Sequence, residues 1–478
     1  MSLTSALNYA ASGISVNAKR AATVSDNIAN ALSPGYTARA NTVSAVAIGG
    51  RSGGVEIGVA TRQTHPYLTV SRMAAEAATS GAAALASATD EIARIWGDPG
   101  DTRAISTMLQ SLEDAFAAAA ARPDQTALLT AAQNAAGTIA KGFNAASSAF
   151  MGLRLQADGA IAQSVSDMNR ALKDVENLNR EIVLARAMNS STAALEDRRQ
   201  QAVDTLNAAV PVKVLSRSNG AISVISQTGT MLLDERAKQF EFDPAATIDP
   251  ASSLQNGALS GLMLDGKPYN YGASESGSLA VQFLLRDRLL PDALAQLDSL
   301  AADLANRFQN PAVDPTVGAT DPALFTDFGG RFEAVNTQGL ASRFRLNDQL
   351  DLQGTNAWRL RAGMYAVSPG LAGDETRLRV QTDAMREPQP GAAGLVAASA
   401  QGLAAQISGI WAETAINADA ALSAATAGFE HFTLAEKSAN GVDSDGELQQ
   451  LMLIEKAYAA NAKVLGTLDD LLQQILEI

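Results

Sequence analysis

Few side chains in this sequence are of the types that carry chemistry. The 478 residues include no cysteine and only two histidines, His65 and His431. A thiolate metal site, a cysteine nucleophile and a disulfide framework are therefore excluded, and histidine-based triads have almost no material. His65 has no acid or nucleophile at a recognisable spacing, and His431 lies beside Phe429 and Phe432. We interpret both histidines as packing or surface residues.

The segment Asp443-Ser444-Asp445-Gly446-Glu447 comes nearest to a metal-binding loop. Its glycine stands two positions earlier than in a calcium-binding EF-hand, and no acid closes the loop at the twelfth position. Because acids are favoured near a helix N-terminus, we interpret it as a solvated helix start. Asp469-Asp470 and Asp197-Arg198-Arg199 are expected on exposed helix faces. The sequence thus predicts no catalytic residue, no metal site and no cofactor.

Charge and hydropathy exclude further classes of function. The 36 Lys and Arg against 50 Asp and Glu leave a net charge of −14, whereas nucleic acids and anionic membranes need a basic surface. We therefore expect neither as a partner. No apolar stretch reaches the roughly 18 residues of a membrane-spanning helix. Residues 1–20 also lack the basic start and apolar block of a cleaved secretory signal.

The elements that must position any site are expected to be long helices. The chain holds 94 alanines, while aromatic residues make up only 5%. Alanine favours helix but buries little area, so such helices pack closely around a thin core. This composition is typical of rods and bundles.

Both ends of the chain carry a heptad pattern, with apolar residues separated by alternating steps of three and four. Such a stripe favours a coiled coil, and finding one at each end favours assembly over two ordinary amphipathic helices. The N-terminal stripe is Leu3, Leu7, Ala10, Ile14, Asn17, Ala21, Val24, Ile28 and Ala31. The C-terminal stripe is Leu451, Ile454, Tyr458, Asn461, Leu465, Leu468, Leu472 and Ile475.

Between the two ends, helix-like and strand-like patterns alternate. We predict a mainly α fold, a long helical rod built from both chain ends with an inserted β-rich middle domain at its tip. Asp101 and Asp124 are placed as caps or first-turn acids of rod helices, and Trp358-Arg359-Leu360-Arg361 is assigned to the β-rich part. The predicted domains are a terminal coiled-coil assembly segment at 1–45 paired with 440–478, a helical rod domain at 46–210 completed by 278–310 and 394–437, and a β-rich outer domain at 211–277 and 311–390.

The N-terminal pattern resembles the signature of the bacterial flagellar axial proteins of the rod, hook and hook-associated kind. The matching stretch runs from Asn27-Ile28-Ala29-Asn30 to the turn Ser33-Pro34-Gly35-Tyr36. Asn440-Gly441-Val442-Asp443 and the segment from Glu455 to Val464 are similar to the closing segment of the same class. The helical character of residues 67–207, with the stretch Leu195 to Asn207, is similar to the hook-associated protein 1 family of the hook–filament junction.

This resemblance implies a structural protein, not an enzyme. It would be exported without a cleaved signal peptide and assembled outside the cell at the distal end of the hook. The implied partners are copies of itself in a ring, the hook protein, the next hook-associated junction protein and through it flagellin, and an export chaperone on the C-terminal helix. Two alternatives stay open: another axial protein (hook or distal rod), and a secreted enzyme on an axial-protein frame.

The assembly residues follow from the two patterns. The axial-protein motif is Asn27, Asn30, Pro34, Gly35 and Tyr36. The predicted seam is Leu7, Ile14, Asn17, Val24, Ile28, Leu451, Ile454, Tyr458, Asn461, Leu465, Leu468, Leu472 and Ile475. Since a lone Asn on an apolar seam fixes register, Asn17 and Asn461 are expected to face each other or share a water; the alternative is that each points to a neighbouring subunit or a central channel.

Overall fold

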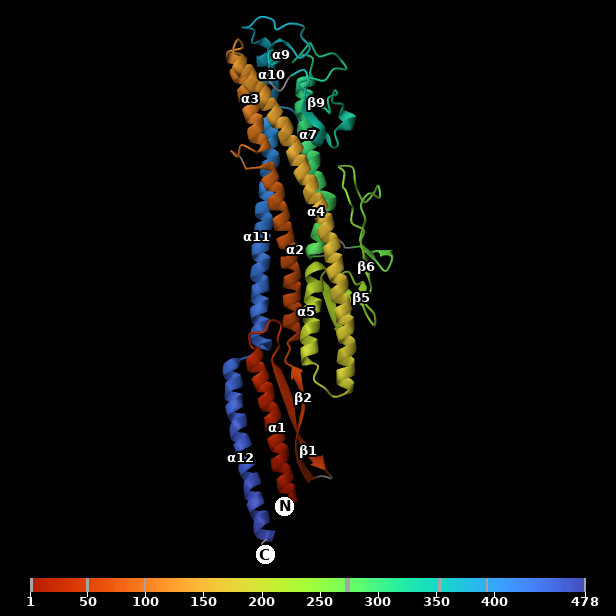
Figure 1. The fold of residues 1–478 in the computed structure, drawn as a ribbon, viewed down its shortest axis with the longest axis vertical. Helices are drawn as coiled ribbons and strands as arrows, with labels where there is room; N and C mark the ends of the chain where they lie inside the picture. The colour runs from red at the N-terminus through yellow and green to blue at the C-terminus, as the bar shows by residue number, and fades with distance from the viewer. Residues whose placement is uncertain are drawn as a thin grey trace.

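The chain forms an elongated rod with both termini at the same end (Figure 1). The computed structural model describes residues 3–48, 51–98, 100–270, 276–350, 355–392 and 394–476. The outermost residues of the predicted terminal segments, 1–2 and 477–478, lie outside the described residues. The fold is mainly α-helical with a few small sheets in the middle of the chain, which confirms the predicted class.

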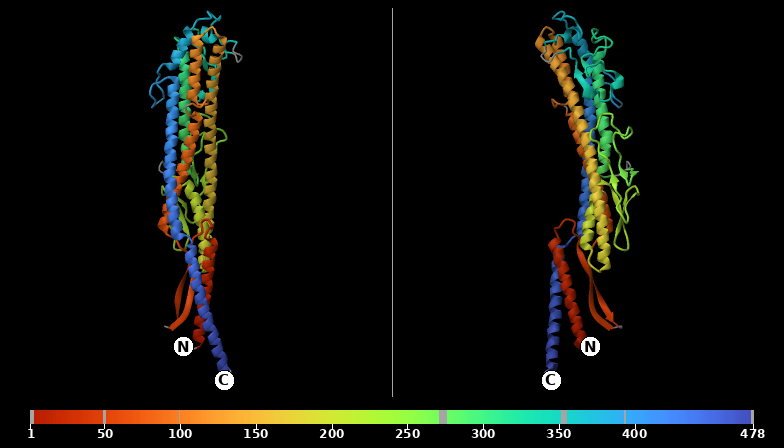
Figure 2. Two further views of the ribbon diagram at one scale, coloured as in Figure 1. Left: turned by 90° about the vertical axis from the view of Figure 1, so that its left-hand side faces the viewer. Right: turned by 45° about the vertical axis from the view of Figure 1, so that its right-hand side comes forward.

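The end of the rod that carries the termini is built from two helices and a hairpin. Helix α1 (Leu3–Asn30) runs antiparallel to α12 (Ser444–Leu476) (Figure 2). The antiparallel strands β1 (Arg39–Ile48) and β2 (Arg51–Arg62) pack against α1 on the side away from α12. We call α1, α12 and this hairpin the terminal unit.

Four helices then build most of the body. Helix α2 (Pro66–Trp96) climbs from the terminal unit and α3 (Ile105–Ala121) continues to the far end. Helix α4 (Thr126–Ala187) returns along the whole body, 62 residues that span about 90 Å at 1.5 Å per residue. Helix α5 (Ala193–Ala209) turns upward again beside it. The breaks between these helices fall at residues 97–104, 122–125 and 188–192.

Small sheets follow along the flank of α4. Strands β3 (Val212–Ser216), β4 (Ile222–Ser226) and β5 (Met231–Leu233) form one antiparallel sheet. A second sheet joins the two-residue strands β6 (Phe240–Glu241), β7 (Met263–Leu264) and β8 (Lys267–Pro268). In Figure 1 these sheets lie beside the middle and lower part of the body, so the strands are distributed along the rod and do not gather only at its tip.

The chain then rises once more to the far end. Helix α6 (Ser278–Leu284) passes through a π-helical turn, η1 (Leu285–Leu289), into α7 (Leu290–Gln309). The far end holds the short ribbon of β9 (Phe325–Asp327) and β10 (Phe344–Leu346). The other elements there are η2 (Ala334–Asn336), α8 (Leu340–Arg343), α9 (Arg359–Ala362) and α10 (Thr376–Arg386).

Two sequence-based expectations about individual residues are wrong. The assignment of Trp358–Arg361 to β structure fails because these residues form the start of α9, a single turn whose Arg359 side chain donates to the carbonyls of Met364 and Ala366. Asp101 and Asp124 do not cap helices either, since α3 and α4 begin after Ala104 and Gln125 without a side-chain cap. The Asp101 carboxylate instead accepts from the Arg103 amide within the preceding turn.

Helix α11 (Ala400–Asn440) completes the body by running back down beside α2. The core between the helices is rich in alanine, and its largest aromatic cluster lies in the upper body, where Phe325 stacks on Phe344 with ring centroids 4.9 Å apart. A second core joins the lower half of α4 to α5 and the flanking sheets. Despite their length, none of the helices in the described part of the chain is apolar enough to cross a membrane.

Candidate assembly junction

Asn27 is the centre of a hydrogen-bond network at the end of the terminal unit that faces the body. Its side chain is only 1% exposed, and its amide makes four hydrogen bonds. The Nδ2 group donates to the Glu447 carboxylate at 2.7 Å and to the Arg39 carbonyl at 2.9 Å. The Oδ1 atom accepts from the Tyr36 hydroxyl at 2.9 Å and the Arg39 amide at 3.0 Å. One residue of α1 thereby holds the following turn, β1 and α12 together.

The rest of the axial-protein motif shapes the turn around Asn27. The Asn30 amide donates to the Asp26 carbonyl and carboxylate and accepts from Ser33, which ends α1. Gly35 has φ of +75°, a left-handed conformation that glycine adopts without a Cβ penalty. Burial raises the pKa of Tyr36 to about 12, Arg39 opposing this shift and Asp26 adding to it. Tyr36 therefore stays a hydroxyl donor at physiological pH.

Ion pairs carry the connection onward to helix α5 of the body. Arg39 stacks over the Tyr36 ring at 4.6 Å and pairs with Asp26. Asp197 of α5 pairs with Arg62 at 2.8 Å and with Arg39 at 3.5 Å. Burial raises the pKa of Asp197, and the Arg62 charge opposes this shift. The expectation that Asp197 lies on an exposed face is wrong, because the hairpin covers it; Asp469 and Asp470 are exposed as predicted.

Asn440, the last residue of α11, connects the α11–α12 turn to the residues just before β1 and just before α2. Its carbonyl accepts from the Ala38 amide at 2.8 Å, and its side-chain oxygen accepts from the His65 amide at 2.9 Å. Only residues 441–443 separate α11 from α12. His65 therefore contributes its backbone here, while the His431 side chain is exposed and meets Phe432 edge-on.

One turn above Asn440, Arg72 of α2 gathers three carboxylates from three helices. It donates to Glu436 of α11 at 2.6 Å, to Asp204 of α5 at 2.7 Å and to Glu76 of α2 at 3.0 Å. Burial raises the pKa of Glu76 to about 6, with Asp204 adding to the shift and Arg72 opposing it. The cluster joins the three helices at the base of the body and holds more acid than its one cation can neutralise.

The acidic segment at the start of α12 has a structural role in this arrangement. The Asp443 carboxylate accepts from the amides of Asp445 and Gly446 and so caps the helix. Glu447 is the partner of Asn27, and burial raises its pKa. Across the described ranges, no group of three or more metal-binding side chains converges.

The structure divides the predicted seam into covered and exposed parts. Asn17 and Val24 of α1 and Ile454 and Leu468 of α12 are buried. A further set is half-buried: Leu7, Ile14, Ile28, Leu451, Asn461 and Leu465. Tyr458, Leu472 and Ile475 are exposed. The structure therefore brings the middle of both stripes against neighbouring elements and leaves the end of α12 open.

Asn17 and Asn461 do not bond to each other in the single chain. The side chain of Asn461 lies over Gly13, one turn before Asn17: a Cβ added at Gly13 would come within 2.7 Å of Asn461 Nδ2. No hydrogen bond joins the two asparagines among the residues described. The residue of α1 that meets Asn461 is thus Gly13, which does not interrupt the apolar stripe and so gives no polar signal in the sequence.

A second stripe on α12 was missed by the sequence reading. Leu453, Ala457, Ala460, Val464, Thr467 and Leu471 follow steps of four and three and are all exposed. Leu453 is 66% exposed, and Leu448 and Met452 beside it are exposed as well. The signal was present, because the apolar residues of α12 occupy more than one heptad line. Exposed apolar rows of this kind mark interaction surfaces.

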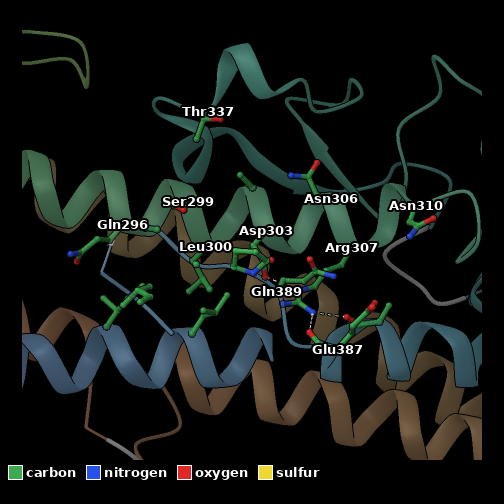
Figure 3. Close-up of a pocket in the computed structure, with 18 of the residues that line it drawn as sticks. Gln296, Ser299, Leu300, Asp303, Asn306, Arg307, Asn310, Thr337, Glu387 and Gln389 are labelled. Atoms are coloured by element: carbon green, nitrogen blue, oxygen red, sulfur yellow. Dashed lines mark hydrogen bonds and ion pairs between the residues drawn. The ribbon is translucent and has the colours of Figure 1, made fainter. Parts of the chain in front are cut away.

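The body also holds a cavity of about 490 Å³ between α7, α11 and residues 384–398 (Figure 3). Arg307 points into this region, and its guanidinium pairs with Asp303 at 2.7 Å. It also donates to the carbonyls of Ala384, Glu387 and Ala398. Arg307 thus fastens residues 384–398 to α7, which is a structural role.

Comparison with known families matches two parts of the chain. The family described as "Flagellar hook-associated protein FlgK helical domain" matches residues 89–312. The family described as "Flagellar basal body rod FlgEFG protein C-terminal" matches residues 438–478. The first match covers α3 to α7, and the second begins at the Asn440 crossing and covers α12.

Comparison with curated proteins finds no sequence match at a significant level. Among solved structures, the flagellar hook junction protein FlgK from Burkholderia pseudomallei is similar, with 19% identity and a TM-score of 0.42. The alignment covers 55% of this chain and 46% of that one, so the chain spans less than half of the length of that relative.

Proposed function

We propose that this chain, which belongs to the FlgK family of flagellar hook-associated proteins, assembles at the distal end of the hook and connects it to the flagellin filament. The observation that carries this proposal is the combination of two features on one chain. Residues 89–312 match the helical domain of the family, and the Asn27 junction joins both chain ends into a terminal unit below that domain.

The proposed role is structural and not catalytic. The polar side chains buried at the junction bond to each other and to the backbone across α1, β1, α5 and α12. In the body, Arg154 and Arg286 likewise hold residues 249–260 against α4, through the carbonyls of Asp249, Ser252 and Ser260. These groups fasten segments together, as a protein under mechanical load requires.

The proposed partners follow from the exposed stripe on α12. A row of apolar residues is costly to leave in water, and further copies of the chain in a ring would cover it. The hook protein on one side and the next hook-associated protein, then flagellin, on the other are the proposed neighbours. Before assembly, an export chaperone on α12 would cover the same stripe. The proposed location is extracellular, reached through the flagellar export apparatus without a cleaved signal.

Another axial protein of the hook or distal rod is the second candidate. It is favoured by the match of residues 438–478 to a family of basal-body rod proteins. The helical character of α3 to α7 and the match of residues 89–312 favour the hook-associated role instead.

Complementation of a strain that lacks its own copy of this gene tests the proposal. The wild-type chain should restore filaments and, with a gold label, mark the hook–filament boundary. A chain with Val464→Asp and Leu471→Asp should be exported but leave bare hooks and flagellin in the medium. The matched control is Gln449→Asp and Gln473→Asp on the same helix, which should restore filaments. Gold label along the flagellar rod or the hook would favour the second candidate. Normal filaments in the strain that lacks this chain would refute both candidate functions.

A further inference from the structure

A second cavity lies where the terminal unit meets the body. It measures about 730 Å³ and is lined by β2, α2, α5, the α4–α5 connection and the β3–β4 hairpin. Four arginines line it: Arg62, Arg186, Arg199 and Arg217. Glu196 is the one acid among the described lining residues. The cavity is therefore cationic in a chain whose net charge is −14.

Three of these arginines already have carboxylate partners within the chain. Arg62 pairs with Asp197, Arg186 with Glu196 at 3.2 Å, and Arg217 with Asp234. Their positive charges are thus largely compensated before any partner arrives.

Arg199 is the arginine that stays uncompensated. It donates to Asn179 Oδ1 at 3.0 Å and to the Gly220 carbonyl at 2.8 Å, both neutral acceptors. No carboxylate of the described residues lies within ion-pair distance of it. Burial lowers the pKa of Arg199 to about 10; among the neighbouring charges Glu196 opposes this shift most, and Arg62 and Arg186 add to it. A partly buried cation that has only neutral hydrogen-bond acceptors favours an incoming anion.

Apolar side chains surround the mouth of the same cavity. Val59 and Val70 belong to its lining and are exposed. Met188 and Leu184, at the end of α4, are exposed close by in the sequence, as is Leu215 on β3. A ligand for this surface would therefore combine a negative charge with apolar contacts.

The turn between α11 and α12 has this combination on the opposite side of the rod. Asp443 and Asp445 are exposed, and the exposed Leu448 follows one turn later. Asp443 is used as the helix cap, whereas no hydrogen bond or ion pair within the described ranges engages the Asp445 carboxylate. In Figure 1 this turn lies at the left edge of the rod, at the height where α5, β2 and the end of α4 lie on the right.

We propose that the arginine-lined cavity of one copy receives the acidic α11–α12 turn of the next copy, with Asp445 facing Arg199. Two different surfaces on opposite sides of one chain form a heterologous contact, and such contacts build rings or helical arrays when they repeat. The inference rests on the proposed function, because it supplies the lateral contact that the proposed ring needs. It also places this contact at the joint and not only along α12.

Crosslinking of single-cysteine variants tests the contact directly, because the chain contains no cysteine of its own. Ser190 lines the cavity, and Ser444 lies between the two acids of the turn; both are exposed. Chains with Ser190→Cys and chains with Ser444→Cys, distinguished by tags, are expressed together in the complemented strain. A short thiol crosslinker should join the two kinds of chain in isolated flagella.

The matched control is Ser87→Cys with Ser444→Cys. Ser87 is exposed on α2, about 30 Å further along the rod, and should give no crosslink. If both tagged chains are present in the flagella and Ser190 does not crosslink to Ser444, the docking inference is wrong and the proposed function stands. If neither chain is found in flagella, the proposed function itself fails, and this inference with it.

Charge variants give an independent readout. Arg199→Gln should lower incorporation into flagella about tenfold, the effect of losing roughly one interfacial charge pair. Arg199→Lys keeps the charge and should retain most incorporation, although it cannot reproduce both neutral hydrogen bonds. Arg170→Gln, on an exposed part of α4, serves as the control and should behave as wild type. Equal losses for Arg199→Gln and Arg199→Lys would show a role in folding and overturn the proposal.

Discussion

The chain contains two antiparallel pairs that join its first half to its last, and they differ in how completely they are covered. Helices α2 and α11 pack side by side; α4, α5 and α6 cover α2, and α3 and α7 pack against α11. Helices α1 and α12 also pack side by side, but in the described part of the chain the cover on this pair is mainly the β1–β2 hairpin, on the side of α1. The first pair is therefore packed against further helices, whereas the second keeps one face of α12 uncovered.

The exposed apolar residues quantify this difference. Three large apolar side chains are exposed on the 41 residues of α11: Ile410, Ile416 and Leu434. Eight are exposed among residues 444–475 of α12: Leu448, Met452, Leu453, Tyr458, Val464, Leu471, Leu472 and Ile475. The same kind of pairing therefore gives a covered core in one place and leaves an exposed apolar surface in the other.

The largest difference in stability between the terminal unit and the body is expected from Asn27→Leu. Loss of the amide leaves the Glu447 carboxylate and the Arg39 amide without their partner and the Tyr36 hydroxyl with Asp26 alone, at a cost of about 4 kcal/mol to the terminal unit. Hydrogen exchange should accelerate throughout α1 and α12 while α2 and α11 keep their protection. Asn30→Ala, which removes bonds within one turn, should have a smaller effect. Equal acceleration in both pairs would mean that the two units unfold as one.

Leu468 and Leu471 separate the inner and outer faces of α12. Leu468 is 9% exposed in the α1–α12 pair, and Leu471 is 47% exposed. Leu468→Asp should destabilise the pair of the free protein by about 3 kcal/mol, because it buries a charge. Leu471→Asp should leave the free protein unchanged and affect assembly alone. Limited proteolysis of the purified variants measures this, and trimming of α12 in both would contradict the assignment of faces.

The body should show a pH dependence that comes from the Arg72 cluster. Burial raises the pKa of Glu76 to about 6 from 4.5, so between these values the folded chain holds more protons than the unfolded chain. The free energy of unfolding should therefore fall as pH rises through this range, by about 2 kcal/mol at most. The partners that face Glu76 are Arg72, Asp204 and Asn207, with Glu436 on the other side of Arg72.

Glu76→Gln tests this assignment by denaturant unfolding between pH 4 and 8. The variant should lose this part of the pH dependence and gain stability above pH 6, where the wild type has an ionised, partly buried acid. Glu91→Gln, on an exposed turn of the same helix, should keep the wild-type profile. A wild-type profile in Glu76→Gln would assign the titration to another group.

The smallest expected effect compares a glycine in each region. On α4, nothing lies within 4 Å of a Cβ added at Gly152, so Gly152→Ala should stabilise the body by about 1 kcal/mol through helix propensity. In the terminal unit, Gly13→Ala should gain nothing, because its Cβ meets Asn461 at 2.7 Å. Gly13→Ala with Asn461→Ala should recover about 1 kcal/mol. Thermal unfolding of the wild type, Gly13→Ala, Asn461→Ala and the double variant would show whether Gly13 and Asn461 are coupled. Additive effects on stability would mean that the two residues act independently.

The sequence predicts the helices well because their apolar period is long and unbroken, as in α4 and α12. It fails where the local pattern is short: Trp358–Arg361 alternates like a strand, but one helical turn held by Arg359 forms there. Asp197 illustrates the limit for the site. Its own neighbours suggest an exposed face, and only the folding of the hairpin, more than a hundred residues earlier, brings Arg62 onto it. The motif around Asn27 was identifiable, but its partner Glu447 was not.

The bond between Asn27 and Glu447 spans 420 residues of sequence, which sets an order of events in folding. Closing a loop of that length from a disordered chain costs about 5 kcal/mol of entropy. Once α2 and α11 have paired, the ends of the loop are already adjacent, and only the hairpin and residues 441–443 remain to be ordered. The folded body thus holds the two terminal segments next to each other before the terminal unit forms. Helix α1 must therefore wait for α12, which follows it by more than 400 residues, so the terminal unit forms at the end of folding.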